Sequence, residues 1–242
     1  MTNNSKQNKP FSPSSEENKQ VILEAIQPLL TQQKTVLEIA SGTGQHAVFF
    51  AEQMPHLTWQ TSDLADSHTG IGQWINDSQL NNVLAPIELN VSESHWPQST
   101  YDVVYSANSF HIMNKQNVSD FFRQINSVLN LPGLVIIYGP FNYNGAFTSE
   151  SNARFNDWLK SNNPESGIKD FEWCDKLAKQ AALVLLHDIE MPQNNRILVW
   201  QKAAKRLPQN EIDKMNRIIN EANKREMSPS ELADDIYKKM FE

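Results

Sequence analysis

Cysteine, basic side chains and long apolar runs are all scarce in this chain of 242 residues. The single cysteine, Cys174, excludes an intramolecular disulfide and any zinc site built from clustered cysteines. Lys and Arg number 21 against 28 Asp and Glu, and the resulting formal charge of -7 argues against a bulk nucleic-acid binder. No apolar run approaches the roughly 20 residues that a membrane-spanning helix needs. No grouping of His, Asp and Glu has the spacing of a metal site, so we expect no metal.

The N-terminal stretch MTNNSKQNKPFSPSS is polar and has no apolar core of a secretory signal. We therefore expect a cytoplasmic protein that does not associate with a membrane. Residues 1–12 show no periodicity and are expected to form a mobile segment. The overall composition, with 39% hydrophobic and 9% aromatic residues, is that of an ordinary globular protein.

Short apolar runs alternate with helical patterns through the first two thirds of the chain. A first helix is expected over residues 15–27, with Pro28 at its end. Strands are expected at 35–39, 57–62, 83–89, 101–106 and 134–138, with helices between them, the clearest at 117–129. Continuous apolar strands that alternate with helices indicate a parallel sheet covered on both faces.

The pattern changes in the last third of the chain. Two further strands, at 183–191 and 197–201, are joined by the turn PQNN, which is too short for a parallel crossover. We therefore expect an α/β fold with a Rossmann-like, mostly parallel sheet whose last strand is antiparallel. Residues 13–204 would form this main domain. Residues 205–242 are charged and helical in pattern, and we expect a two-helix extension whose apolar stripe offers a contact for a homodimer.

A glycine-rich turn, Glu38-Ile39-Ala40-Ser41-Gly42-Thr43-Gly44, follows the first expected strand and opens a helix. Glycine in this position lets backbone N–H groups approach a ligand. The spacing Gly42-x-Gly44-x-x-Ala47, with Asp63 about 20 residues further on, fits a relaxed dinucleotide fingerprint. Against that interpretation, Glu38 would face the pyrophosphate with a charge of the same sign. A cationic ligand with a ribose diol, S-adenosylmethionine, suits Glu38 and Asp63 better.

The segment VLEIASGTGQHA resembles the first motif of class I S-adenosylmethionine-dependent methyltransferases, with Ala40 in place of the motif's first glycine. More narrowly, residues 11–202 are similar to the methyltransferase-like 26 family, through the stretches LTWQTSD, YDVVYSANSFHI, YGPF and MPQNNRILV. The resemblance implies a seven-stranded sheet with an antiparallel last pair. It also implies that the cofactor lies across the carboxyl ends of the first strands.

The same resemblance assigns cofactor-binding residues. Gly42 and Gly44 would back the methionine part, Glu38 would orient it, and Asp63 would bind the ribose hydroxyls. Asn90, after the third strand, would accept a hydrogen bond from the adenine amino group. The other expected cofactor contacts are Ala40, Leu64, Val91, Ser106, Ala107 and Asn108.

Candidate catalytic residues follow the later strands. Methyl transfer by in-line displacement requires alignment of donor and acceptor, and a general base only where the acceptor must lose a proton. His111, five residues after the fourth expected strand, is the candidate base. Tyr138 and Asn195 are candidates for the acceptor site, and Asn152 with Phe155 for a lid. Loop hydrogen bonding for His111 and turn formation for Asn195 remain the structural alternatives.

Three functions stay open on the sequence alone. The first is an S-adenosylmethionine-dependent methyltransferase that acts on a small-molecule acceptor through oxygen, sulfur or nitrogen. Residues 106–109 (SANS) lack the Pro-Pro-aromatic motif of enzymes that methylate adenine or glutamine, which favours a small molecule. The second is a non-catalytic protein that binds S-adenosylmethionine, and the third is an NAD-dependent oxidoreductase. The sequence does not name the acceptor.

Overall fold

The computed structural model of the chain describes residues 9–94, 96–202, 214 and 217. The chain divides into two units, Met1–Ala203 and Ala204–Glu242. The sheet and the helices that cover it belong to the first unit. Of the helical extension expected over 205–242, only Lys214 and Arg217 are described, and both are helical. The remainder of that extension, and with it the expected homodimer contact, lies outside the described residues.

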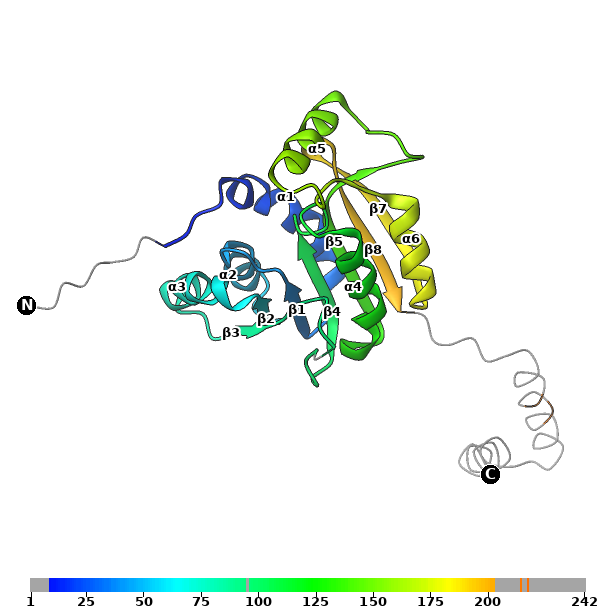
Figure 1. Ribbon diagram of the computed structural model, residues 1–242. Coiled ribbons are helices and arrows are strands. Elements are labelled where there is room, and N and C mark those ends of the chain that lie inside the picture. The colour runs from blue at the N-terminus through cyan, green and yellow to red at the C-terminus, as the bar shows by residue number, and fades with distance from the viewer. Residues whose placement is uncertain (1–8, 95, 203–213, 215–216, 218–242) are drawn as a thin grey trace, which may run out of the picture. The chain divides into compact units, whose positions relative to one another are not determined.

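An eight-stranded sheet runs through the centre of the first unit (Figure 1). Its order is β3 (Val83–Glu88), β2 (Thr58–Asp63), β1 (Thr35–Ile39), β4 (Tyr101–Ala107), β5 (Leu129–Asn142), β8 (Asn195–Lys202) and β7 (Leu183–Met191). The two-residue strand β6 (Lys169–Asp170) pairs with the end of β5. Strands β1 to β5 are parallel, and β8 is antiparallel to both of its neighbours. The predicted α/β fold with an antiparallel last strand is confirmed, and β6 raises the count from seven to eight.

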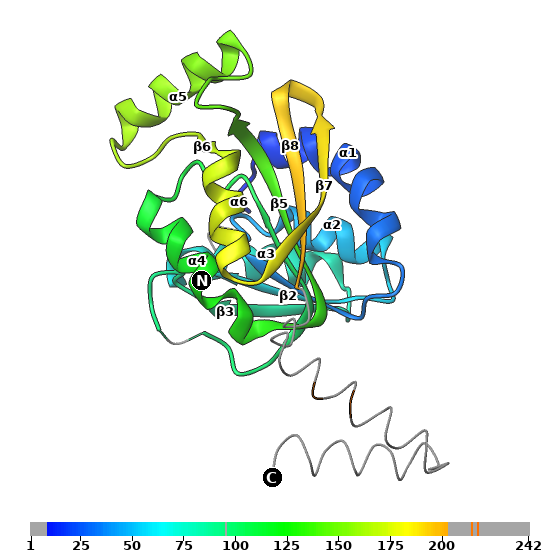
Figure 2. The same cartoon turned by 90° about the vertical axis from the view of Figure 1, so that its right-hand side faces the viewer.

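Helices cover both faces of the sheet. One face carries α1 (Pro13–Leu30), α2 (Gln45–Gln53) and α3 (His68–Ser78), and the other carries α4 (Lys115–Val128) and α6 (Phe171–Gln180), as Figure 2 shows. Neighbouring residues of β5 serve opposite cores, Ile136 facing α1 and α2 and Ile137 facing α4 and α6. This alternation explains why the central strands are apolar throughout.

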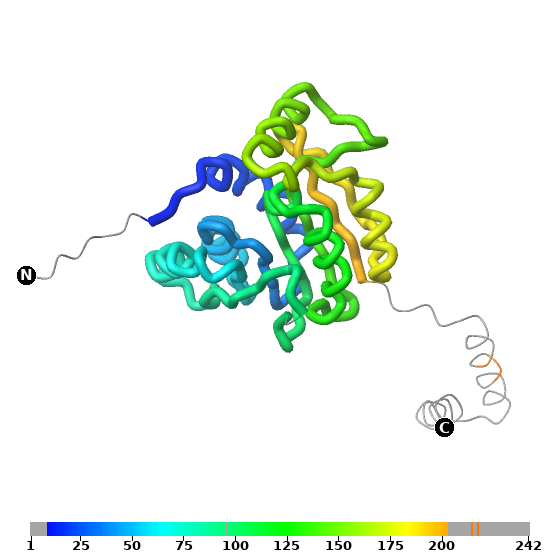
Figure 3. The backbone as a smooth tube through the Cα atoms, viewed as in Figure 1, coloured from blue at the N-terminus to red at the C-terminus, as the bar shows by residue number. Residues whose placement is uncertain are grey.

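Helix α5 (Glu150–Asn162) stands apart from the two covering layers. The backbone trace in Figure 3 shows the chain leaving β5, passing through α5 at the top and returning to α6. The carboxyl end of β5 leads into this excursion, so α5 lies at the edge of the sheet where the parallel strands end. None of the helices in the described part of the chain has the length and hydropathy needed to cross a membrane.

The first helix is longer than the sequence predicts. It begins at Pro13, because Ser12 is the N-cap and its side chain accepts a hydrogen bond from the backbone N–H of Ser15. It continues past Pro28 to Leu30, which is buried. Proline deprives one carbonyl, that of Glu24, of its helical partner. Glu24 is exposed, where water can satisfy that carbonyl, and Leu30 keeps the last turn packed on the core.

Residues 9–12 also depart from the expected mobile segment. The indole of Trp74 in α3 donates a hydrogen bond of 2.7 Å to the carbonyl of Pro10, and Lys9 forms an ion pair of 2.8 Å with Asp77. The backbone N–H of Ser12 donates to the side chain of Gln45 in α2. These partners are distant in sequence, so no local pattern in the N-terminal stretch reveals them.

Candidate functional site

A pocket of about 1090 Å³ opens at the carboxyl ends of β1, β2 and β4. Its walls come from the turns after these strands, from the first turns of α1 and from α5. This is the edge at which open α/β sheets bind their ligands. The volume slightly exceeds the range of roughly 300–1,000 Å³ that is usual for small-molecule sites, so the pocket has room for more than one small ligand.

The turn after β1 requires unusual backbone angles. Ala40 and Gly42 both have a φ of 59°, and Gly44 has a φ of 87°. A Cβ atom on Gly44 would also lie 3.1 Å from the backbone of Ile71 in α3, so close packing as well as conformation requires glycine there. The left-handed conformation costs a residue with a Cβ roughly 1–2 kcal/mol. Ala40 therefore holds the turn in a strained conformation.

Glu38 is a buried carboxyl group in the wall of this pocket, with an exposed fraction of 2%. Its Oε2 accepts a hydrogen bond of 3.1 Å from the indole N–H of Trp59 in β2. Burial is the main reason that the pKa of Glu38 is raised to about 7; hydrogen bonding to Trp59 and Ser41 opposes the rise, and the negative charge of Asp63 adds to it. A cation in the pocket would favour the ionised form.

Asp63 lies at the end of β2, at the same edge of the sheet as Glu38. The parallel register that pairs Ile39 with Ser62 places the two acidic residues on adjacent strand ends. One carboxylate oxygen of Asp63 accepts a hydrogen bond of 2.7 Å from the N–H of Gly42, and the other accepts one of 2.7 Å from the N–H of Leu64. A carboxylate has about four acceptor sites, so both oxygens can accept a further bond from ligand hydroxyls.

Most of the predicted cofactor residues line this pocket. Those in its wall are Glu38, Ala40, Gly42, Asp63, Leu64, Asn90, Val91, Ala107 and Asn108. Gly44 and Ser106 do not line it. Gly44 packs on α3, and the fully buried Ser106 donates a hydrogen bond of 2.6 Å to the carbonyl of Ile39, which joins the ends of β4 and β1.

Asn90 lines the pocket, but its side-chain oxygen is already engaged. It accepts hydrogen bonds from the backbone N–H of Ser92 at 3.1 Å and from the Ser92 hydroxyl at 2.8 Å. These two bonds occupy both acceptor sites of the amide oxygen. The expectation that this oxygen accepts the adenine amino group therefore conflicts with the turn that Asn90 forms.

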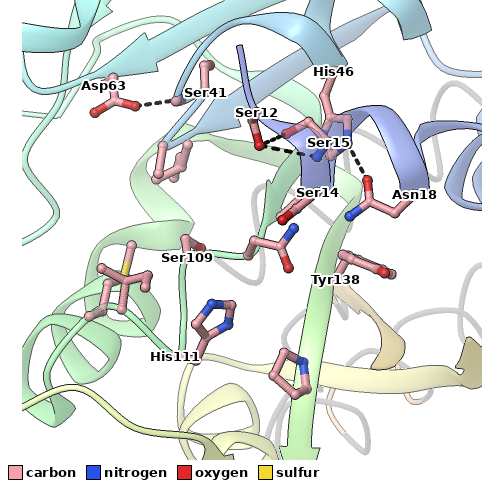
Figure 4. A pocket seen from close by; sticks show the side chains of 18 of the residues that line it. Ser12, Ser14, Ser15, Asn18, Ser41, His46, Asp63, Ser109, His111 and Tyr138 are labelled. Carbon is pink, nitrogen blue, oxygen red and sulfur yellow. Dashed lines mark hydrogen bonds between the residues drawn. The ribbon is translucent and has the colours of Figure 1, made fainter. Parts of the chain in front are cut away.

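His111, in the loop between β4 and α4, faces the pocket from below in the view of Figure 4. It is 6% exposed, and its ring meets the ring of Phe155 edge-on at 5.3 Å between centroids. Burial, and to a smaller extent the charge of Lys169, lowers its pKa to about 4, so the imidazole is neutral at physiological pH. None of the hydrogen bonds among the described residues uses its ring nitrogens, which leaves them for a ligand.

Tyr138 and Asn195, the other two catalytic candidates, also line the pocket. Burial raises the pKa of Tyr138, and hydrogen bonds from the side chains of Asn18 and Asn195 oppose that rise. The oxygen of Asn18 lies 2.7 Å from Nε2 of His46 (Figure 4). Burial lowers the pKa of His46 to about 4, so its ring is neutral and carries one N–H. Since the Asn18 oxygen can only accept, the Nε2–H tautomer donates this bond, and the Asn18 NH2 group is left to face away from His46. Asn18 is thereby oriented toward Tyr138 and the pocket.

Helix α1 contributes to the pocket in a way that the sequence does not reveal. Ser12, Ser14, Ser15 and Asn18 all line it from the first turns of that helix. The buried His46 of α2 lines it as well. A polar residue within a helical pattern gives no sequence signal that it lines a pocket, because the side chain that orients it, as His46 orients Asn18, lies on another helix. Across the described ranges, no three metal-ligating side chains come together.

A protein family described as "Protein of unknown function (DUF938)" matches residues 9–202 of the chain. The chain belongs to this family. The matched region contains every strand of the sheet and every residue of the pocket wall. The DUF938 region is therefore the part of the chain that builds the candidate site.

Several solved structures that are similar to this DUF938 protein are named as methyltransferases. An O-methyltransferase family protein from Burkholderia thailandensis has a TM-score of 0.66 at 16% identity and covers 80% of this chain. The S-adenosylmethionine-dependent methyltransferase SibL has a TM-score of 0.68 at 18% identity over 79% of the chain. An O-methyltransferase family 2 protein from Planctomyces limnophilus, solved in complex with apigenin, has a TM-score of 0.63 at 11% identity over 77%. At these identities, the likeness shows a methyltransferase-like Rossmann fold.

The chain matches less than two thirds of the length of each of these proteins. The matched region spans 60% of the Burkholderia protein, 56% of SibL and 62% of the Planctomyces protein.

The strain at Ala40 generates a stability prediction. Ala40→Gly should relieve the left-handed conformation and stabilise the protein by about 1 kcal/mol, which raises the thermal midpoint by roughly 2–4 °C. Ala47→Gly, the same change inside α2, should lower the midpoint, because glycine destabilises a helix interior. Differential scanning calorimetry checks both. A lower midpoint for Ala40→Gly would contradict the strain at this turn.

Proposed function

We propose that this DUF938 protein is an S-adenosylmethionine-dependent methyltransferase that acts on a small-molecule acceptor. The observation that supports it most strongly is the pair of carboxyl groups, Glu38 and Asp63, at adjacent strand ends in one pocket. S-adenosylmethionine carries an ammonium group, a sulfonium and a ribose diol. Glu38 suits the ammonium, and the two oxygens of Asp63 suit the diol. The resemblance to the methyltransferase-like 26 family is part of the same proposal.

The adenine is best accommodated by apolar side chains. Leu64, 52% exposed, and the buried Val91 both line the pocket beyond Asp63. An exposed leucine beside a polar ligand site offers a surface against which a purine can pack. We assign the adenine to these two residues in place of the Asn90 oxygen, which Ser92 occupies.

Chemistry in this pocket requires little from the protein beyond alignment. When bound, S-adenosylmethionine supplies a methyl group activated by its sulfonium. His111 faces the pocket and has free ring nitrogens, so it is placed to take up a proton from the acceptor as the methyl group transfers. These free nitrogens, and the space beside them, favour an enzyme over a protein that binds the cofactor without turnover. Glu38 disfavours a dinucleotide, since its carboxylate would repel a pyrophosphate.

Replacing Asp63 tests the proposed ribose contact. Asp63→Asn should weaken binding of S-adenosylhomocysteine about tenfold or more, because a hydrogen bond to a charged group contributes roughly 1.5–3 kcal/mol. The control is Asp66→Asn, which removes an exposed carboxylate three residues away and outside the pocket. Isothermal titration calorimetry measures both. Equal affinity in the two variants would contradict the assignment of Asp63 to the ribose.

The raised pKa of Glu38, about 7 in the free protein, predicts pH-dependent binding. An ammonium group binds the ionised carboxylate, so binding below this pKa must first remove a proton. Affinity for S-adenosylhomocysteine should therefore rise about tenfold from about pH 6 to about pH 8. Glu38→Gln should bind more weakly and lose this dependence. A wild-type affinity that stays constant across the window would contradict the assignment of Glu38 to the ammonium.

A further inference from the structure

The part of the pocket beyond Glu38 and Asp63 has a distinct chemical character. We call it the acceptor end; it is lined by the start of α1, the loop that carries His111, Tyr138, α5 and the turn before β8. Its uncharged polar side chains are serine hydroxyls and the carboxamides of Asn18, Asn114, Asn152, Asn163, Gln193 and Asn195. Some of these carboxamides also bond within the protein, since the oxygens of Asn114 and Asn163 each accept one backbone N–H and the amide nitrogen of Asn152 donates to Thr148. Carboxamides offer both N–H donors and carbonyl acceptors. They match a ligand that presents hydroxyl groups without a net charge.

The charged groups near the acceptor end disfavour an anion. Among the described residues of the pocket wall, the ones that carry a charge are carboxyl groups. Glu17 lies at the acceptor end, and Glu38 and Asp63 lie at the opposite, cofactor end. The buried ammonium of Lys169, behind His111, is committed to the carbonyls of Met113 at 2.6 Å and Gly167 at 2.7 Å. Both buried imidazoles are neutral. A carboxylate or phosphate that entered would lose its hydration and find carboxylates of its own sign.

A cationic acceptor is disfavoured by its own chemistry. A protonated amine has no lone pair with which to take up a methyl group, and it would lie close to the sulfonium charge. A ligand that is neutral on entry avoids both costs. It can also donate a hydrogen bond to the neutral imidazole of His111, whose ring nitrogens are free.

One wall of the acceptor end is apolar. The ring of Phe155 lines it and meets His111 edge-on, and it stacks at 5.9 Å and 12° on the exposed Trp158, which itself lies outside the pocket lining. Ile112 completes this wall and is 53% exposed. An exposed apolar surface at the mouth of a polar pocket suits a ligand with a flat apolar framework.

We propose that the acceptor is an uncharged small molecule with a hydroxyl group on a flat apolar framework, and that His111 takes the hydroxyl proton. This inference rests on the proposed methyltransferase function. The acceptor oxygen forms a bond to the methyl carbon as the carbon–sulfur bond breaks. The bonding pair stays on sulfur, the products are a methyl ether and a neutral thioether, and the proton goes to a ring nitrogen of His111.

To test this inference, the small molecules of a cell extract are first separated by charge. Ion exchange at neutral pH gives anionic, cationic and neutral pools, and each is offered to the full chain in two measurements. The first follows transfer of a radiolabelled methyl group from S-adenosylmethionine. The second is independent of turnover: mass spectrometry identifies the compounds that the protein retains on ultrafiltration when it is saturated with S-adenosylhomocysteine. We expect label and retention in the neutral pool, with the label on oxygen and stable to mild base.

Several outcomes would overturn the inference. Label or retention in the anionic or cationic pool would do so, as would base-labile label, which marks a methyl ester, or label on nitrogen or sulfur. If S-adenosylhomocysteine binds but no pool accepts label, the proposed function fails instead. The two failures are therefore distinguishable.

Two lysine variants test whether the charge of the pocket wall is what excludes anionic compounds from the acceptor end. Gln193 is exposed and lines the acceptor end, whereas Gln180 is exposed at the end of α6, away from this pocket. Gln193→Lys should allow at least part of the anionic pool to be retained, and Gln180→Lys should not. If Gln193→Lys still excludes anions as completely as the wild type, shape and not charge selects the ligand, and the inference is wrong.

Discussion

The burial of one carboxyl group at the end of β1 is the constraint around which the pocket is organised. Glu38 has little exposure and one indole partner, so its ionised form is poorly solvated in the free protein. A buried carboxyl group without a partner cation is destabilising. Such a group is stabilised when a ligand brings a positive charge, and the parallel register places Asp63 beside it at the same edge. The strained turn at Ala40 then brings backbone N–H groups to this edge.

The acceptor end is built on a different principle. Its walls come from segments that are far apart in the sequence and are joined by specific hydrogen bonds. His46 fixes the orientation of Asn18 through a hydrogen bond. The ammonium of Lys169 donates to the carbonyl of Met113, in the loop after His111, and to that of Gly167, before β6, and so links the two segments. Burial, together with the charge of Lys169, keeps His111 neutral, and the hydrogen bonds of Lys169 hold its loop in place. The two ends of the pocket therefore differ in charge, and we infer that they receive a cationic cofactor and an uncharged acceptor.

The sequence predicts most of the sheet because its signals are local. Five apolar runs separated by helical patterns indicate parallel strands, and the short turn PQNN is sufficient to predict the antiparallel end. The acidic residue at the end of β1 and the one at the end of β2 can be placed at one edge for the same reason. The sequence does not predict that the helix continues past Pro28, because packing of Leu30 decides it. Nor does it predict Asn18 and His46 as wall residues, or the turn that occupies Asn90, since these depend on contacts between folded elements.

The most direct measurement is the thermal midpoint of the full chain with excess S-adenosylhomocysteine, compared with excess NADH, at a pH above the pKa of Glu38. A ligand at 100 times its dissociation constant stabilises a protein by about 2.7 kcal/mol, which corresponds to a rise of roughly 5–11 °C here. The proposed function predicts this rise with S-adenosylhomocysteine and none with NADH. No rise with S-adenosylhomocysteine, or a rise with NADH alone, would contradict it.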